Sequence, residues 1–273
     1  MGARPDSGGN RRNVRSDRFR LPVSGLCVTV QSLTGMEDLL LRESHASDSA
    51  LALELFGRLV HTDGTPENFG ELPAADGQAL LLILRRTALG DLVNAETRCS
   101  AIQCAARVDV SFRIGEYLAA QRIRRRKGVT AGDKNGWFKL PGESAQFRLP
   151  TCADLAALDM EAEPYQVLTR RCIDSVDVSW RLRKRVEDAM DAIAPSFSRS
   201  MAGVCPECNQ AFEFFFDVYS FVLRELRNHA ASVYQDVHLL ALNYKWPEQQ
   251  ILQLPRSRRI QYVEMLRDQG VAA

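Results

Sequence analysis

The segment Cys205–Cys208 reads C-P-E-C, and the alternating run Phe212–Phe216, reading F-E-F-F-F, follows it shortly before Asp217. Two cysteines separated by two residues can hold one metal ion from a single turn, which is called a knuckle. The alternation predicts a strand behind the knuckle, and Asp217 is a favourable N-cap for a helix. The segment therefore predicts a small folded module built around two thiolates.

A weaker version of this order occurs earlier in the chain. Cys99 and Cys104 are separated by four residues, an alternating segment at 108–112 follows, and 114–118 has helical spacing. The matching order predicts two tandem degenerate repeats, each with a small β-hairpin knuckle of the zinc-ribbon type. We expect an α+β fold, mainly helical, completed by a long C-terminal helix and a helical tail.

The segments before the two knuckles also match. An extended stretch ends at Thr34 in the first half and at Thr151 in the second, and each threonine precedes an acidic first turn and a Leu/Ala-rich helix. Threonine at this position caps a helix. The predicted divisions are a disordered basic tail (1–22), a first repeat (23–120), a basic and Gly-rich linker (121–144), a second repeat (145–216) and a C-terminal helical arm (217–273).

Composition narrows the class of protein. Of 273 residues, 45% are hydrophobic and 25% are charged, which is ordinary for a globular protein, and the net charge of +1 gives no overall field that attracts nucleic acid or an anionic membrane. The sequence shows neither a signal-peptide pattern nor an apolar run of about 20 residues, the length of a membrane span. We expect a cytoplasmic location, where the seven cysteines stay free or bind metal.

Four cysteines are the candidate ligands of one structural zinc ion. Cys205 and Cys208 supply two thiolates, and Cys99 and Cys104 supply the others if the halves pack about a pseudo-two-fold axis. The longer spacing of the first pair leaves open that these are two ordinary buried cysteines. Four thiolates close the coordination sphere, so such zinc supports folding rather than catalysis.

No set of residues suggests catalysis. The sequence contains no Gly-rich phosphate loop, nucleophile elbow or H-E-x-x-H motif. Cys27, Cys152 and Cys172 have no partner at ligand spacing, and core packing explains them. We therefore predict that the chain is not an enzyme.

The C-terminal arm carries a candidate partner-binding surface. From Asp217 onward apolar residues recur at alternating spacings of four and three, which predicts one continuous helix that Pro247 ends. The body of the protein, a second copy of the chain or a helical partner can cover such a seam. The candidate residues of this surface and of the tail behind it are Tyr219, Leu223, Leu226, Val233, Val237, Leu240, Tyr244, Trp246, Arg258 and Arg259.

A series of motifs from 147 onward resembles a known family. They read F-R-L-P-T-x-x-D-L at 147–155, C-P-x-C at 205–208, F-x-F-D-x-x-x-F at 214–221, V-H-x-L-A-x-x-Y-x-W at 237–246, and I-L-x-L-P then R-R-x-x-Y at 251–262. The series resembles the baseplate hub assembly chaperones and baseplate proteins of T-even-like contractile-tailed phages, with related copies in prophages and phage-tail-like injection systems. It covers about 145–268, and the first half matches more loosely.

The resemblance implies a non-enzymatic assembly factor, or a minor structural component, of the baseplate hub of a contractile phage tail or injection system. Its expected partners are hub, spike or tape-measure-type tail proteins, with no membrane and no nucleic acid, in a bacterial or phage-infected cell or within a tail particle. The alternative is a zinc-ribbon nucleic-acid-binding regulator, which the C-P-E-C knuckle and the Arg-rich segments at 11–20 and 122–127 suggest.

Overall fold

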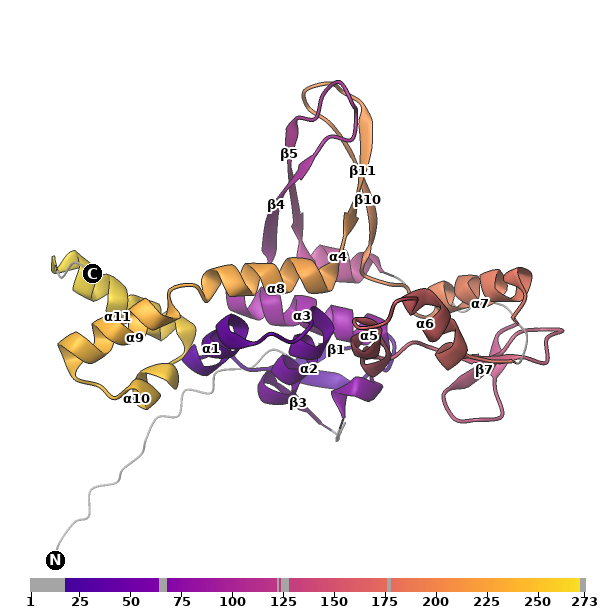
Figure 1. Cartoon of the computed structure of the whole chain (residues 1–273), viewed down its shortest axis with the longest axis horizontal. Coiled ribbons are helices and arrows are strands. Elements are labelled where there is room, and N and C mark those ends of the chain that lie inside the picture. The colour runs from indigo at the N-terminus through magenta and orange to yellow at the C-terminus, as the bar shows by residue number, and fades with distance from the viewer. Residues whose placement is uncertain (1–17, 64–67, 122, 124–127, 176–177, 271–273) are drawn as a thin grey trace, which may run out of the picture.

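The computed structural model describes residues 18–63, 68–121, 123, 128–175 and 178–270. Its helices surround small antiparallel sheets, so the predicted α+β class is confirmed. The body is elongated, and two β-hairpins stand upright on it (Figure 1). We call these two hairpins together the tower.

The first half begins with a three-stranded antiparallel sheet in the order β1-β2-β3. Two helices lie between its second and third strands, and a long helix leads from the sheet to the first hairpin. The elements are β1 (Arg18–Arg20), β2 (Cys27–Val30), α1 (Gly35–Glu43), α2 (Asp48–Leu59), β3 (Val60–Thr62), η1 (Phe69–Glu71), α3 (Ala74–Leu89), β4 (Leu92–Arg98), β5 (Arg107–Arg113) and α4 (Ile114–Ala120).

The second half repeats this order of elements around a four-stranded sheet, β6-β7-β8-β9. Apart from η1, which has no counterpart among the described residues of the second half, strand, two helices, strand, long helix, hairpin and helix follow one another in both halves. The elements are β6 (Thr130–Ala131), β7 (Trp137–Lys139), β8 (Gln146–Arg148), α5 (Cys152–Leu158), α6 (Pro164–Cys172), β9 (Ile173–Asp174), α7 (Trp180–Ile193), β10 (Arg199–Val204), β11 (Ala211–Phe216) and α8 (Val218–His229).

A C-terminal lobe of three helices completes the body at the end opposite α7 (Figure 1). The helices are α9 (Val233–Tyr244), α10 (Glu248–Leu252) and α11 (Arg256–Asp268). Their apolar side chains form a separate cluster around Leu240 and Val263, against which Tyr244, Trp246 and Tyr262 pack.

The main core is built around α3. Its residues from Ala79 to Leu84 are all buried, which is the pattern of a helix covered on every side. Helices α2 and α8 pack against this core, and Phe56 and Leu223 are fully buried in it. The tower and the second half are thus anchored to one central helix.

Both predicted threonine caps are confirmed. Thr34 caps α1 and Thr151 caps α5, and in each case the carboxylate three positions later, Glu37 or Asp154, accepts a hydrogen bond from the backbone N–H of the cap. This reciprocal pair is a capping box, which satisfies two otherwise free backbone N–H groups. The strands predicted before the two threonines are present as β2 and β8.

Two predicted divisions are wrong. The tail assigned as disordered to residue 22 includes β1, which pairs with β2, and Leu21 is 1% exposed in the main core. The linker assigned to 121–144 includes β6 and β7, and Leu140 is buried beneath that sheet. Residues 1–17 and the Arg-rich positions 122 and 124–127 lie outside the described residues.

The single long C-terminal helix is also wrong. The chain turns at 230–232, between α8 and α9, while Ala230 and Val233 on either side of the turn are both fully buried. The turn brings α9 back against α1, where its Asp236 reaches Arg259. Asp217 caps α8, and a left-handed Lys245 ends α9, so the predicted outer limits hold.

Candidate metal centre

The tower brings the two cysteine pairs together at its tip. β4 pairs with β5 from Leu92–Arg113 up to Arg98–Arg107, and β10 pairs with β11 up to Val204–Ala211. Each hairpin loop carries two cysteines, and Val108 and Phe212 are buried just beneath them. The alternation that predicted these strands places one buried residue of each hairpin directly below the thiols.

The two loops have similar backbone geometry despite their different lengths. The Cys99 N–H donates to the Ala106 carbonyl at 2.9 Å, and the Cys205 N–H donates to the Gln210 carbonyl at 3.0 Å. The residue after the second cysteine is left-handed in both loops, with φ of 46° at Ala105 and 56° at Asn209. The two additional residues of the first loop therefore leave the hydrogen bond at its base and the left-handed residue after its second cysteine unchanged.

The four sulfurs have the spacing that a tetrahedral metal requires. Cys99 Sγ lies 3.7 Å from Cys208 Sγ, Cys104 Sγ lies 3.8 Å from Cys205 Sγ, and the four sulfurs all lie within 4.8 Å of one another. A tetrahedron with metal–sulfur bonds of about 2.3 Å has sulfur–sulfur edges of about 3.8 Å. All four cysteines are free thiols at distances well beyond a disulfide bond, so the cluster fits one metal ion.

The surroundings lower the pKa of one of these thiols and raise the pKa of another. Backbone donors, first that of Cys208 and then that of Glu207, lower the pKa of the Cys205 thiol to about 7. A hydrogen bond at Ala106 acts to lower the pKa of Cys104, but burial and the neighbouring thiols raise it to about 12. Because negative charges this close repel one another, the four sulfurs are not ionised together unless a cation neutralises them.

The base of the tower is held by aromatic side chains. Phe216 lies edge-on to Phe112 at 5.4 Å and to Tyr117 at 5.7 Å between ring centroids, and Phe221 of α8 packs on it at 5.2 Å. The Tyr117 hydroxyl donates to the Phe197 carbonyl at 2.6 Å. The hairpins thus contact each other through aromatic rings below and through the four cysteines above.

The remaining cysteines lie away from the tip. Cys152 and Cys172 are buried, at 1% and 2% exposure, and Cys27 is half-buried on β2. Burial raises the pKa of both Cys152 and Cys172 to about 11, so they stay protonated. These positions match the packing role expected from their spacing.

Most residues predicted to bind a partner pack within the chain itself. Tyr219, Leu223 and Leu226 are buried in the main core. In the C-terminal lobe Leu240 is buried, and Val237, Tyr244 and Trp246 are half-buried against it. Val233 is buried at the turn between α8 and α9, and Arg259 is 1% exposed, whereas Arg258 is exposed to solvent. The body covers this seam, as one of the alternatives allowed.

A buried charge network was not predicted from the sequence. Asp38 of α1 accepts hydrogen bonds from Arg256 and Arg259 of α11, and Arg259 also donates to Asp236 of α9 at 3.0 Å. All four side chains are at least nine-tenths buried. The sequence contains the two partners, as an acidic first turn in α1 and an Arg-rich start of α11, but no local pattern indicates that these segments contact each other.

No protein-family model matches the chain, and neither does any curated protein or solved structure. Among the described residues no helix is long and apolar enough to cross a membrane.

Proposed function

We propose that the chain is a non-enzymatic assembly factor, or a minor structural component, of the baseplate hub of a contractile phage tail or related injection system. The observation that carries this proposal is that the motifs on which the resemblance is based lie at junctions between elements of the fold. Thr151 and Asp217 cap helices, Cys205 and Cys208 belong to the tip cluster, and Trp246 stacks on Tyr244. Motifs that build rigid junctions suit a scaffold that holds other proteins.

The metal of the tip cluster is zinc in this proposal. Four sulfur ligands at tetrahedral spacing are the donor set of structural zinc sites, and such a site leaves no open position for a substrate. The zinc would tie the two hairpins together, with a contribution to folding on the order of 10 kcal/mol.

The two halves descend, in this proposal, from one duplicated unit. The repeated order of elements, the two capping boxes and the two similar cysteine loops support this origin. A duplicated unit supplies one cysteine pair from each copy, which explains why ligands about 100 positions apart in the sequence meet at one point.

Co-purification tests the baseplate role. A tagged chain expressed together with an intact tail gene cluster is expected to recover hub, spike or tape-measure-type proteins, identified by mass spectrometry. The same cells expressing an unrelated tagged protein provide the control. Recovery of none of these tail proteins would contradict the proposal.

Elemental analysis tests the zinc site independently. The purified chain is expected to carry one zinc per molecule, and Cys208→Ser is expected to lose most of it because three ligands hold the ion far less tightly. Cys172→Ser, which changes a buried cysteine outside the cluster, is the matched control and should keep its zinc. Stoichiometric zinc in Cys208→Ser would show that the ligand set is wrong.

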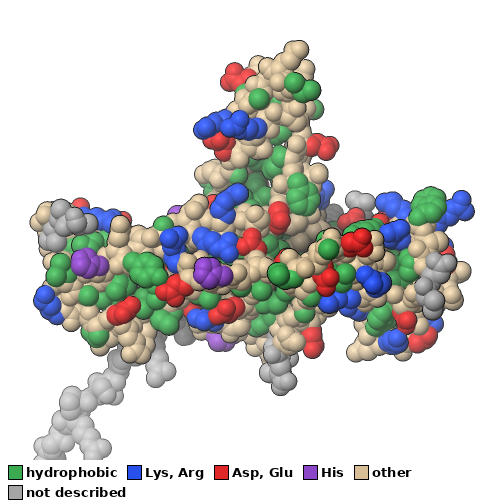
Figure 2. Space-filling model, viewed as in Figure 1, with side chains coloured by type: hydrophobic (Ala, Val, Ile, Leu, Met, Phe, Trp, Pro, Cys, Tyr) green, Lys and Arg blue, Asp and Glu red, His purple; other side chains and the backbone are tan. Residues whose placement is uncertain are grey.

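A zinc-ribbon nucleic-acid regulator is the second candidate, since Arg98 and Arg107 pair across β4 and β5 just beneath the thiols. Arg107 lies 3.4 Å from Glu96, however, and both signs of charge are scattered over the visible face (Figure 2). This candidate requires binding to DNA or RNA that weakens steeply with salt. A flat titration at low salt would eliminate it.

A further inference from the structure

The α3–α5 and α11–α1 interfaces are closed by the same backbone arrangement. Pro73 before α3 forms an antiparallel bridge with Thr151, and Pro255 before α11 forms one with Thr34. The residue after each proline makes an equivalent backbone hydrogen bond. The Ala74 N–H donates to the Pro150 carbonyl at 2.8 Å, and the Arg256 N–H donates to the Leu33 carbonyl at 2.9 Å. Positions can therefore be matched one to one between the two interfaces.

This matching makes Ala74 the counterpart of Arg256 and Leu155 the counterpart of Asp38. In the α11–α1 interface the Arg256 side chain is 7% exposed and donates from Nε to Asp38 at 2.9 Å. An arginine thus fills the space beside the first turn of the threonine-capped helix.

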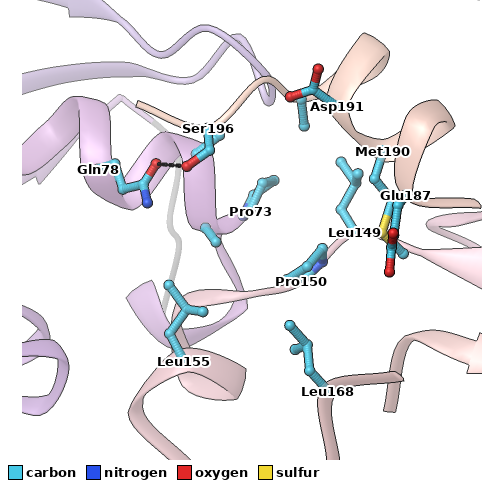
Figure 3. A pocket seen from close by; sticks show the side chains of 13 residues that line it. Pro73, Gln78, Leu149, Pro150, Leu155, Leu168, Glu187, Met190, Asp191 and Ser196 are labelled. Atoms are coloured by element: carbon cyan, nitrogen blue, oxygen red, sulfur yellow. Dashed lines mark hydrogen bonds between the residues drawn. The ribbon is translucent and has the colours of Figure 1, made fainter. Parts of the chain in front are cut away.

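The corresponding space in the α3–α5 interface is not filled by the chain. Ala74 contributes only a methyl group, and Leu155 remains half-buried. A groove of about 270 Å³ lies here, between α3, α5, α6 and α7 (Figure 3). The chain therefore shows, in its other interface, what kind of side chain such a space accepts.

The lining of this groove has two chemical parts. Half-buried apolar side chains form most of it, including Leu155 of α5, Leu168 of α6 and Met190 of α7 (Figure 3). Carboxylates of Glu187 and Asp191 stand on the α7 side. Glu187 already accepts a hydrogen bond on Oε1 from the Tyr165 hydroxyl and has its second oxygen to offer, and Asp191 is exposed. An apolar surface beside two carboxylates suits a side chain with an aliphatic stem and a cationic end.

We propose that this groove binds an arginine side chain of a partner protein. The stem would pack on Leu155 and Met190, and the guanidinium group would donate to Glu187 and Asp191. The chemistry holds whether or not the partner belongs to a baseplate, because it depends only on the groove and on its counterpart at Arg256.

Methionine-methyl NMR of the full chain tests this inference directly. The sequence has six methionines, of which Met190 lines the groove, while Met36, Met160 and Met265 are exposed elsewhere and serve as internal controls. The probe is N-acetyl-Leu-Arg-amide, and N-acetyl-Leu-Gln-amide is its uncharged match. We expect a saturable shift of the Met190 signal, assigned with Met190→Leu, and a markedly weaker response to the glutamine probe.

Variants of the groove locate the binding. Glu187→Gln with Asp191→Asn should weaken the arginine probe about fivefold and leave the glutamine probe unchanged. Ala74→Arg should abolish binding by filling the groove from within, whereas Met265→Arg on α11 should not. An unshifted Met190 signal, equal binding of both probes, or unchanged affinity in the carboxylate variant would each overturn the proposal. The carboxylate variant alters only half-buried and exposed side chains, so it stays informative if Ala74→Arg misfolds.

Discussion

The α3–α5 and α11–α1 interfaces share one backbone arrangement, but the small and the large residue at the contact lie on opposite helices in the two interfaces. Gly77 of α3 makes room for Cys152 of α5, and Gly35 of α1 makes room for Arg259 of α11. Counted from the bridging prolines and threonines, Gly77 corresponds to Arg259 and Gly35 corresponds to Cys152. The close approach needs one small residue, and either helix can supply it.

The consequence for chemistry is large. Where the glycine lies on α3, the buried partner is a protonated thiol in an apolar core. Where it lies on α1, the space admits a guanidinium group, and two arginines and two aspartates are buried together. The Nη1 atoms of Arg256 and Arg259 are buried without a hydrogen-bond partner, so this network is only partly satisfied.

The largest expected difference between the interfaces comes from Asp38→Ala. This change leaves Arg256 and Arg259 buried without their shared carboxylate, and breaking a buried charge network costs about 3–5 kcal/mol. Urea unfolding should show this loss, whereas Leu155→Ala at the corresponding position, half-buried beside the groove, should cost clearly less.

A control separates charge from packing in that prediction. Neutralising all four groups together, with Asp38→Asn, Asp236→Asn, Arg256→Met and Arg259→Met, should recover much of the lost stability because no unpaired charge remains. If Asp38→Ala costs less than about 1 kcal/mol, the network is solvated in solution and the contrast between the interfaces is lost.

The next largest effect is expected from Gly77→Ala. A Cβ at this position would lie 2.3 Å from Cys152 Sγ, so the core must shift at a cost of about 2–3 kcal/mol. Adding Cys152→Ala removes the nearer of two conflicts, the other being the Tyr219 hydroxyl at 2.9 Å, and should reduce that cost in a double-mutant cycle measured by thermal or urea unfolding.

The same cycle in the other interface should give a different answer. A Cβ on Gly35 would lie 2.8 Å from the backbone Cα of Leu252 as well as 2.9 Å from Arg259 Nη1, so Arg259→Ala cannot relieve it. Equal coupling energies in the two double-mutant cycles would show that the two glycines have the same role, which would contradict the difference between the interfaces.

Local signals predicted much of this architecture. Thr34, Thr151 and Asp217 were identified as caps because capping depends on the next three residues. The four cysteines were identified because a knuckle is also local, although their meeting depended on an inferred symmetry. The fold class follows from hydrophobic periodicity, whereas the outer limits of the C-terminal arm follow from the Asp217 cap and from Pro247 as a helix stop.

The wrong or missing predictions concern features that depend on contacts between residues far apart in the sequence. The apolar spacing continues through the turn between Ala230 and Val233, so periodicity could not reveal that the helix breaks. Short strands such as β7 are too brief to outweigh the Gly and Asp residues around them, and Leu140 is buried only by long-range packing. Asp38 and Arg256 are 218 positions apart, which no local pattern connects.

The smallest expected effect is a pH dependence that comes from Asp154 in the first turn of α5. Burial alone would raise the pKa of Asp154, but hydrogen bonds from Arg148 and Thr151 outweigh it and hold the pKa at about 2. A depressed pKa in the folded state adds stability above the unfolded value of about 4, and this stability disappears as the pH falls from about 4 to 2. The carboxylate should contribute about 1–2 kcal/mol at neutral pH after partial screening. The unfolding free energies of the chain and of Asp154→Asn should therefore differ at pH 7, and the difference should fall to about half at pH 3 and vanish near pH 2. A difference that stays constant would show that the carboxylate acts only through its shape.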